Sequence, residues 1–232
     1  MARRYVIKQD SAPSAPISGI DYHATLNEEQ YAAVSSEPGA ALVIAGAGSG
    51  KTRTLTYRVA WLLDHGTDPW NILLLTFTNK AAREMTERVR ALIPIDLSRL
   101  WSGTFHSIAN RILRQHADYL GYTPAFTIMD SDDRKSMIKS IVKALKLDEK
   151  SSRFPKPEVL SSLFSLADNE GAGIQETLEN AYPYLSNHLD AILDVHEQYV
   201  LRKQETNSMD FDDLLLNVVR LFQEQEHLRA LY

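Results

Sequence analysis

The stretch Ala45-Gly46-Ala47-Gly48-Ser49-Gly50-Lys51-Thr52 decides the fold, because it joins an apolar run at residues 40–44 to a helical pattern at residues 52–65. A glycine-rich turn between a strand and a helix points main-chain N–H groups at a phosphate, and the helix dipole adds positive potential there. In this pattern Lys51 reaches the β- and γ-phosphates, and the Thr52 hydroxyl ligates Mg²⁺. An ordinary helix start is the alternative interpretation, but the strand–turn–helix context favours a site for a nucleoside triphosphate and Mg²⁺. Ala45 stands where the strict pattern has glycine.

The composition limits the class of protein. Hydrophobic residues make up 44% and charged residues 24% of the 232 positions, which is ordinary for a globular protein. The chain has no cysteine, which excludes disulfides, thiolate metal sites and cysteine nucleophiles, and its histidines show no zinc-ligand spacing. Apolar runs such as residues 72–75 are too short to cross a bilayer, and residues 1–20 lack the apolar core of a signal peptide. We expect a flexible tail at residues 1–20, no membrane partner and a cytoplasmic location.

Charge is unevenly distributed along the chain, although its net value is −5. Residues 80–114 contain seven lysines and arginines against three acidic residues, whereas residues 157–201 contain no lysine or arginine. Local fields rather than the total charge decide where a polyanion binds. The first stretch is therefore the candidate track for a nucleic acid.

Apolar runs and helical patterns alternate along residues 21–130. The runs expected to form strands are 40–44, 72–77, 101–105 and 126–129, and the expected helices begin near Glu28, at Thr52, at Thr78 or Asn79, and at Ser107. Asn27 is the expected N-cap of the first helix, with Gln30 completing a capping box. This alternation predicts an α/β domain with a parallel sheet and helices on both faces.

From Asp130 onward the pattern is helical only. Asp130 is the expected cap of one helix, Pro157 fits the first turn of the next, and Asp210 is the expected cap of a last amphipathic helix. We therefore predict a helical insertion at residues 131–207 within an α/β domain made of residues 21–130 and 208–232.

Four further strings lie in order around the glycine-rich turn. They are Leu-Asn-Glu-Glu-Gln at 26–30, Thr-Phe-Thr-Asn-Lys-Ala-Ala at 76–82, Gly-Thr-Phe-His-Ser at 103–107 and Met-Asp-Phe-Asp-Asp-Leu-Leu at 209–215. Together they resemble the UvrD/Rep/PcrA family of superfamily 1 DNA helicases over about residues 24–222, and alanine at position 45 is usual in that family. The resemblance implies a RecA-like ATPase domain (1A) interrupted by a helical domain (1B). It also implies ATP-dependent translocation in the 3′→5′ direction along single-stranded DNA, and unwinding of duplex DNA in repair or replication.

The nucleotide site has two further candidate residues. The Gln30 amide presents one donor and one acceptor, which match adenine N6 and N7. The alternative is that it only completes the capping box, and the resemblance favours the adenine contact. Arg53 corresponds to a family position near the base, and a solvated helix arginine is equally plausible. The candidate nucleotide-binding residues are Gln30, Ala45, Gly46, Ala47, Gly48, Ser49, Gly50, Lys51, Thr52 and Arg53, with Lys51 and Thr52 also catalytic and Thr52 the Mg²⁺ ligand.

Two turns between a strand and a helix are candidates for single-stranded DNA. Phe77 ends an apolar run at the sheet edge where α/β proteins bind ligands, and an aromatic ring there can stack a base of any identity. A core aromatic residue is the alternative. The hydroxyls of Thr78 and Thr104, the N–H groups at the following helix starts and Lys80 can hold phosphates. For His106, a structural role is as plausible as a contact with DNA. The candidates are Phe77, Thr78, Asn79, Lys80, Thr104, Phe105 and His106.

Lysines recur on one face of the expected helix after Asp130, at Lys135, Lys139, Lys143 and Lys146. A solvated face of an amphipathic helix is the simpler interpretation. The sharper hypothesis is a duplex-contacting patch at single-strand/double-strand junctions, since the analogous domain of the family touches duplex DNA. Asp210, Asp212 and Asp213 could suggest a metal cluster, but acids in a first helical turn are favoured without any ligand, and we favour capping.

The sequence to Tyr232 contains no apolar strand followed by Asp-Glu, the acids that order Mg²⁺ and activate water in this family. We therefore expect an N-terminal part of a helicase that binds nucleotide without turning it over and lacks the second motor domain, its partner in the parent. Two alternatives remain open: a subunit of a helicase–nuclease, and a non-motor, ATP-responsive binder of single-stranded DNA.

Overall fold

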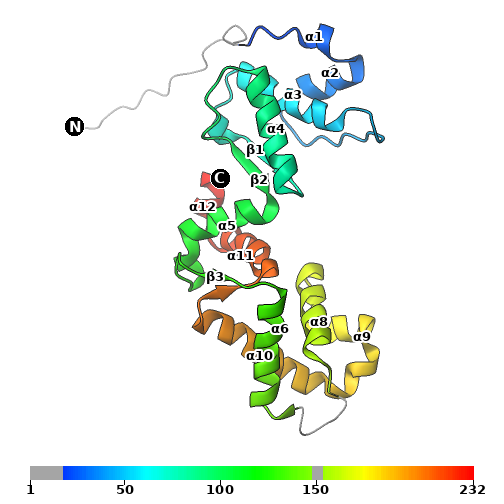
Figure 1. Ribbon diagram of the computed structural model, residues 1–232, viewed down its shortest axis with the longest axis vertical. Coiled ribbons are helices and arrows are strands. Elements are labelled where there is room, and N and C mark those ends of the chain that lie inside the picture. Colours follow the sequence, from blue (N-terminus) through cyan, green and yellow to red (C-terminus); the bar gives the residue numbers. More distant parts are fainter. Residues whose placement is uncertain (1–17, 148–153) are drawn as a thin grey trace, which may run out of the picture. The chain divides into compact units, whose positions relative to one another are not determined.

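The computed structural model describes residues 18–147 and 154–232, which divide into two compact units at Phe105 and His106 (Figure 1). The predicted tail lies largely outside the described residues. No helix in the described ranges is both long and apolar enough to cross a membrane.

The first unit is a βαβ arrangement with helices packed beside it. Strands β1 and β2 pair in parallel, from Leu73 opposite Trp101 to Thr76 opposite Thr104, and α4 forms the crossover between them (Figure 1). Parallel neighbours require such a crossover, which agrees with the predicted alternation. The elements in chain order are α1 (Tyr22–Thr25), α2 (Glu28–Ser35), α3 (Lys51–Asp64), η1 (Pro69–Asn71), β1 (Leu73–Thr76), α4 (Asn79–Leu92) and β2 (Trp101–Thr104).

Apolar side chains of α3, β1 and α4 form the core of this unit. Val59, Leu63, Leu74, Met85 and Val89 are all buried within one cluster. The helical spacing of the α3 and α4 members directs them to one face of each helix, as the sequence pattern requires. This packing fixes the start of α3, and with it the glycine-rich turn, relative to β1.

The predicted strand at residues 40–44 is wrong for this structure. The segment has no strand assignment, and the side chains of Leu42 and Ile44 are 87% and 89% exposed. A strand requires a hydrogen-bonded neighbour as well as apolar side chains, and no described segment pairs with residues 40–44. In place of one larger parallel sheet, the described residues form two separate two-stranded parallel pairs, β1–β2 and a short pair in the second unit that includes part of the predicted strand at residues 126–129.

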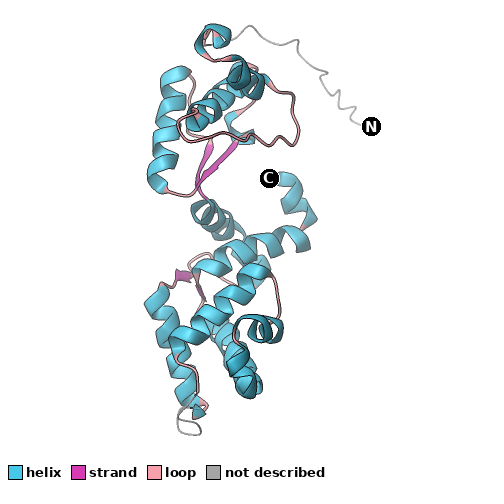
Figure 2. Cartoon of the chain, turned by 90° about the vertical axis from the view of Figure 1, so that its right-hand side faces the viewer, coloured by secondary structure: helices cyan, strands magenta, loops and turns pink. Residues whose placement is uncertain are grey.

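The second unit is mostly helical, as Figure 2 shows by colour. Its elements are α5 (Phe105–His116, beginning at the last residue of the first unit), η2 (Ala117–Leu120), β3 (Thr127–Ile128), α6 (Ser131–Ala144), α8 (Pro157–Glu170), α9 (Ile174–Ala181), η3 (Pro183–His188), α10 (Leu189–Glu205), β4 (Ser208–Met209), α11 (Phe211–Glu224) and α12 (Glu226–Leu231). A single apolar cluster joins α6, α8, α9 and α10, and includes Ile138, Phe164 and Ile192. The predicted helices after Asp130 are confirmed.

Helix starts follow the predicted capping residues. Asn27 and Gln30 form a capping box at α2, and Asp210 and Asp213 form one at α11. Asp130 caps α6, and Pro157 occupies the first turn of α8. These side chain–backbone hydrogen bonds could be anticipated because each depends on three or four neighbouring residues alone.

The helical insertion enters and leaves through the short parallel pair of β3 and β4, with Thr127 opposite Ser208 and Ile128 opposite Met209. This pair lies beside the predicted boundaries at residues 130 and 208. The division between the two compact units falls elsewhere, at Phe105. The assignment of residues 21–130 and 208–232 to one domain therefore stays a prediction.

Candidate functional site

The glycine-rich turn leads into α3 through a left-handed residue. Gly50 is the N-cap of α3 with φ +85°, a conformation that glycine adopts without strain. A Cβ atom at this position would lie 2.9 Å from Nε2 of Gln30, so a larger residue would also displace the Gln30 amide. The N–H groups of the first turn of α3 are therefore presented at the turn, where the helix dipole favours an anion.

Lys51 lies over this turn. Its ammonium donates hydrogen bonds to the carbonyl oxygens of Ala45, at 3.0 Å, and Gly46, at 2.8 Å. The Ser49 hydroxyl also donates to the Gly46 carbonyl, at 2.8 Å. The lysine charge is thus held beside the main-chain donors that begin α3.

A cavity of about 890 Å³ adjoins the turn, between α2, α3 and residues 39–46. It brings together five of the predicted nucleotide-binding residues, which are Gln30, Ala45, Gly46, Ser49 and Lys51. The other five predicted residues, Ala47, Gly48, Gly50, Thr52 and Arg53, do not belong to its lining. Thr52 lies exposed in the first turn of α3.

Gln30 connects α2 to the turn. Its amide nitrogen donates to the carbonyl oxygen of Ser49 at 3.0 Å, and its amide oxygen accepts from the Asn27 N–H at 3.4 Å. The capping interpretation is therefore realised in the structure, and the same amide also lines the cavity. The adenine contact stays a prediction.

Arg53 is not a free solvated arginine. Its guanidinium donates to the Thr25 carbonyl oxygen at 2.9 Å and lies 5.4 Å from the centre of the Tyr57 ring. It ties the start of α3 to the connection between α1 and α2. No described contact of Arg53 involves the cavity beside the turn.

Phe77 follows β1 and is 91% exposed, which excludes the core interpretation. The ring of Phe105, which is 46% exposed, lies 6.0 Å from it between ring centres, at an angle of 51°. Because Thr76 and Thr104 are register partners, both sequence strings end at the same edge of the sheet. Two accessible aromatic rings therefore meet at the carboxyl edge of the parallel strands.

Polar groups surround this aromatic pair. The Thr78 hydroxyl accepts from the Ala81 N–H at 3.1 Å and caps α4, so Asn79 is its first residue. Lys80 is exposed and lies 4.0 Å from Glu84. These groups place a helix N-terminus and a positive charge beside Phe77.

His106 belongs to the second unit and packs on Phe211. Their ring centres are 5.7 Å apart at an angle of 72°, an edge-to-face contact. His106 is thus held by α11, an element far from it in the sequence.

Lysines lie on the exposed face of α6, as the sequence pattern predicts. Lys139 and Lys143 are exposed, whereas Ile138, Ile141 and Val142 are buried in the core of the insertion. Lys135 is partly buried and pairs with Asp132 at 3.0 Å, so its charge is partly neutralised. Lys146 follows the helix in a left-handed conformation.

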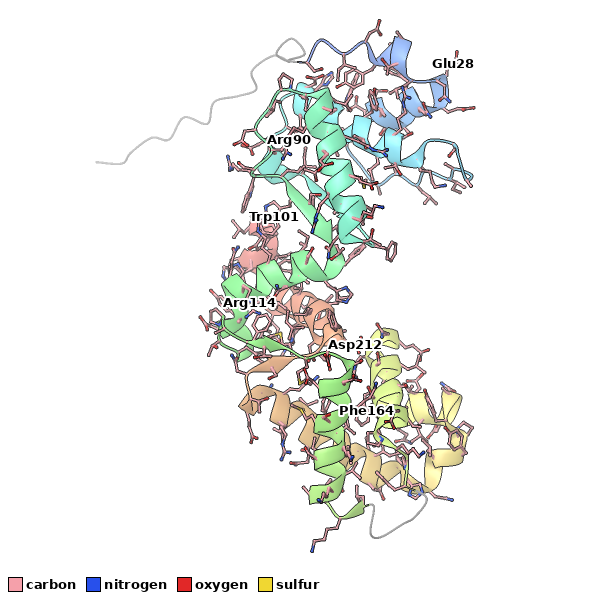
Figure 3. The ribbon with its side chains drawn as sticks, in the orientation of Figure 1. Glu28, Arg90, Trp101, Arg114, Phe164 and Asp212 are labelled. Carbon is pink, nitrogen blue, oxygen red and sulfur yellow. The ribbon has the colours of Figure 1, made fainter. Side chains whose placement is uncertain are left out.

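Sequence reasoning missed a buried ionic network at the start of α11. Lys203 lies 3.2 Å from Asp210 and 2.7 Å from Asp213, Arg134 lies 2.6 Å from Asp212, and the Tyr199 hydroxyl donates to Asp210 at 2.7 Å. Figure 3 labels Asp212, which lies where α11 meets α6. A signal was available, since Lys203 follows Ile192, Val195 and Tyr199 on the apolar face of α10. A basic residue on such a face indicates a buried acidic partner.

The three aspartates do not form a metal site. Among the described residues, no group of three histidine, cysteine or acidic side chains could hold a metal ion. Burial favours a raised pKa at Asp210, but Lys203 and Arg134 hold its pKa below the ordinary value. The capping interpretation is confirmed for Asp210 and Asp213, and both also carry ion pairs.

Asp168, on α8 beside this network, gives a pH-dependent prediction. Burial raises its pKa from 3.8 to about 6, and Asp210 and Asp213 add to the rise against the opposing charge of Lys203. Because the folded state binds this proton more tightly than the unfolded state, protonated Asp168 contributes to stability. The contribution is fully present below the pKa of the unfolded state and is lost as the pH rises through about 6. Asp168→Asn should therefore increase the free energy of unfolding at pH 8 by at most about 3 kcal/mol and by almost nothing at pH 4.

The measurement is urea unfolding of both proteins at the two pH values. Asp194→Asn, which removes an exposed carboxylate of α10, is the control for the loss of one charge. An equal effect of Asp168→Asn at both pH values would contradict the raised pKa.

Comparison with known proteins shows which proteins this chain resembles. The family model described as the UvrD/REP helicase N-terminal domain matches residues 26–232. The chain is 39% identical over 208 residues to "ATP-dependent DNA helicase PcrA" of Staphylococcus aureus, which covers 89% of this chain and 28% of the relative. It is 40% identical over 199 residues to the protein of the same name from Staphylococcus epidermidis, with 85% and 26% covered. The chain thus spans little more than a quarter of the length of these relatives.

Proposed function

This chain belongs to the UvrD/REP helicase family, and we propose that it is the ATP-binding and single-strand-binding part of an ATP-dependent 3′→5′ DNA helicase. The observation that carries the proposal is the pair of exposed rings, Phe77 and Phe105, at one sheet edge in the unit that also holds the phosphate-binding turn. Family membership implies a P-loop NTPase fold. Unwinding of duplex DNA and the second motor domain belong to the longer protein, and turnover of ATP is proposed only for that protein.

The turn before α3 fits the triphosphate of ATP. Gly50 adopts the left-handed conformation that begins α3, and the first N–H groups of α3 are available as donors. Lys51 holds a positive charge over the turn, and the exposed Thr52 hydroxyl is available as a ligand of Mg²⁺. When bound, Mg²⁺ supplies neutralisation of the phosphate charge. The amide of Gln30 is proposed to recognise the adenine, and Arg53 to lie near the base.

The single DNA strand is proposed to run along the edge at which β1 and β2 end. Phe77 and Phe105 would stack bases without regard to sequence, as a translocating motor requires. Thr78, Asn79 and Lys80, with Thr104, would hold the phosphates between the stacked bases. His106, in the second unit, is proposed as a further residue that contacts DNA.

Removal of the Phe77 ring tests the proposal most directly. Phe77→Ala should weaken binding of a dT oligonucleotide about 5- to 150-fold, the equivalent of about 1–3 kcal/mol per stacked base. Thermal stability should not change, because the side chain is 91% exposed. The affinity is measured by fluorescence anisotropy at fixed salt.

Tyr184→Ala is the matched control, since this tyrosine is 70% exposed and lies in the insertion, outside the proposed track. It should leave the oligonucleotide affinity unchanged. Equal affinities of Phe77→Ala and the unsubstituted chain would refute the single-strand site.

The exposed lysines of α6 are proposed to contact duplex DNA at a single-strand/double-strand junction. Replacing both Lys139 and Lys143 by glutamine should lower the slope of log affinity against log salt by about 2 if each neutralises one phosphate. Lys135 is expected to add less, because Asp132 already pairs with it at 3.0 Å.

The slope is measured with a blunt duplex between about 50 and 200 mM salt. Lys156→Gln, an exposed lysine before α8, is the control variant. An unchanged slope in the double variant would show that this face of α6 is only solvated.

A further inference from the structure

The turn at the start of α11 has two chemically different sides. Asp210 is 2% exposed and, with Asp213, accepts the ammonium of Lys203. Phe211, between them, is 52% exposed and directs its ring to His106. Side chains of one short segment therefore contact both the helical insertion and α5.

The insertion meets this turn through charge. Its apolar cluster draws on α6, α8, α9 and α10, and among the described residues no member comes from α11. The contacts that join α6 and α10 to the turn are instead ion pairs and hydrogen bonds from Arg134, Tyr199 and Lys203. Ion pairs and hydrogen bonds are directional, so they fix the orientation of the turn more narrowly than apolar packing.

Arg134 also contributes to fixing the orientation of the Asp210–Asp213 turn. Its Nη1 donates to Asp212 at 2.6 Å, and its Nε lies 3.8 Å from Asp210. The Arg134 side chain is only 9% exposed, and a buried cation is held in place by the carboxylates that pair with it. The network therefore leaves the Asp210–Asp213 turn little freedom.

On the other side, the turn holds His106. The ring of His106 makes an edge-to-face contact with the ring of Phe211. His106 lies in the string Gly-Thr-Phe-His-Ser, one of the two strings proposed above to contact single-stranded DNA.

We infer that Phe211 is a positioning residue for His106, and that Arg134 and Lys203 act on His106 through the Asp210–Asp213 turn. The orientation of the helical insertion and the position of a DNA-contacting side chain are thereby coupled within the second unit. The inference that the two are coupled rests on geometry alone, and its importance for DNA binding rests on the proposed function.

The test follows the His106 imidazole by NMR of ¹³C-labelled protein, with His106→Gln used to assign its signal. Phe211→Leu removes the aromatic ring and defines the largest expected shift. Lys203→Met should shift the same signal in the absence of DNA, and Asp212→Asn, a milder change at the network, should shift it less. Lys156→Met, an exposed lysine of the insertion, is the matched control and should leave it in place.

An unmoved His106 signal in a folded Lys203→Met or Asp212→Asn variant would overturn the coupling. If Lys203→Met does not fold, Asp212→Asn alone decides. The affinity of His106→Gln for a dT oligonucleotide is measured separately. If this affinity equals that of the unsubstituted chain, the result counts against the proposed DNA contact and not against the coupling.

Discussion

Replacement of Lys51 by alanine should abolish measurable binding of Mg-ATP to this chain. The ammonium is held over the turn by the Ala45 and Gly46 carbonyl oxygens, 3.0 and 2.8 Å away, beside the N-terminus of α3. Loss of one partner of a close charge pair costs about 2–5 kcal/mol, which corresponds to at least about a thirtyfold loss of affinity. Isothermal titration calorimetry of both proteins provides the measurement.

Lys80→Ala is the matched control, because Lys80 is an exposed lysine of the same unit and does not line the cavity. It should bind Mg-ATP as the unsubstituted chain does. If Lys51→Ala bound with unchanged affinity, the assignment of Lys51 to the phosphates would be refuted.

Replacement of Lys203 by methionine should cost about 3–5 kcal/mol of the free energy of unfolding. The side chain is 5% exposed, and its removal leaves the carboxylates of Asp210 and Asp213 buried beside each other without that cation. Breaking a buried ion pair from one side is expensive because the remaining charge is uncompensated. Urea unfolding monitored by circular dichroism gives the difference.

The double variant Lys203→Met/Asp213→Asn sharpens this prediction. Because the second change removes one of the orphaned charges, the double variant should lose less stability than the sum of the two single variants. Lys139→Met, on the exposed face of α6, should be close to neutral. Additive single effects would mean that Lys203 and Asp213 do not act as a pair.

Local features of the fold followed from the sequence. The capping box at α2, the caps at α6 and α11 and the proline at the start of α8 were all predicted, because each depends on a few adjacent residues. The glycine-rich turn was also predicted, and Gly50 shows why, since its left-handed conformation favours glycine.

Features that depend on residues far apart in the sequence could not be predicted from it. Residues 40–44 have the composition of a strand, but a strand exists only where a neighbouring segment supplies hydrogen bonds, and periodicity cannot reveal that neighbour. The ionic network joins Arg134 to Asp212 across 78 positions of sequence, so its partners could not be paired in advance. Phe77 is a third example. The sequence allowed either a core aromatic residue or an exposed one, and the structure shows that it is exposed.

The central claim is that the turn at residues 45–52 binds the phosphates of ATP, and NMR titration of ¹⁵N-labelled chain with a magnesium-bound, non-hydrolysable ATP analogue tests it most directly. The account predicts that the largest amide shifts fall on Gly46–Thr52, with the Gln30 side-chain amide also moving. It further predicts that Lys51→Ala removes these shifts. Amide shifts confined to other parts of the chain, or none at saturating analogue, would contradict it.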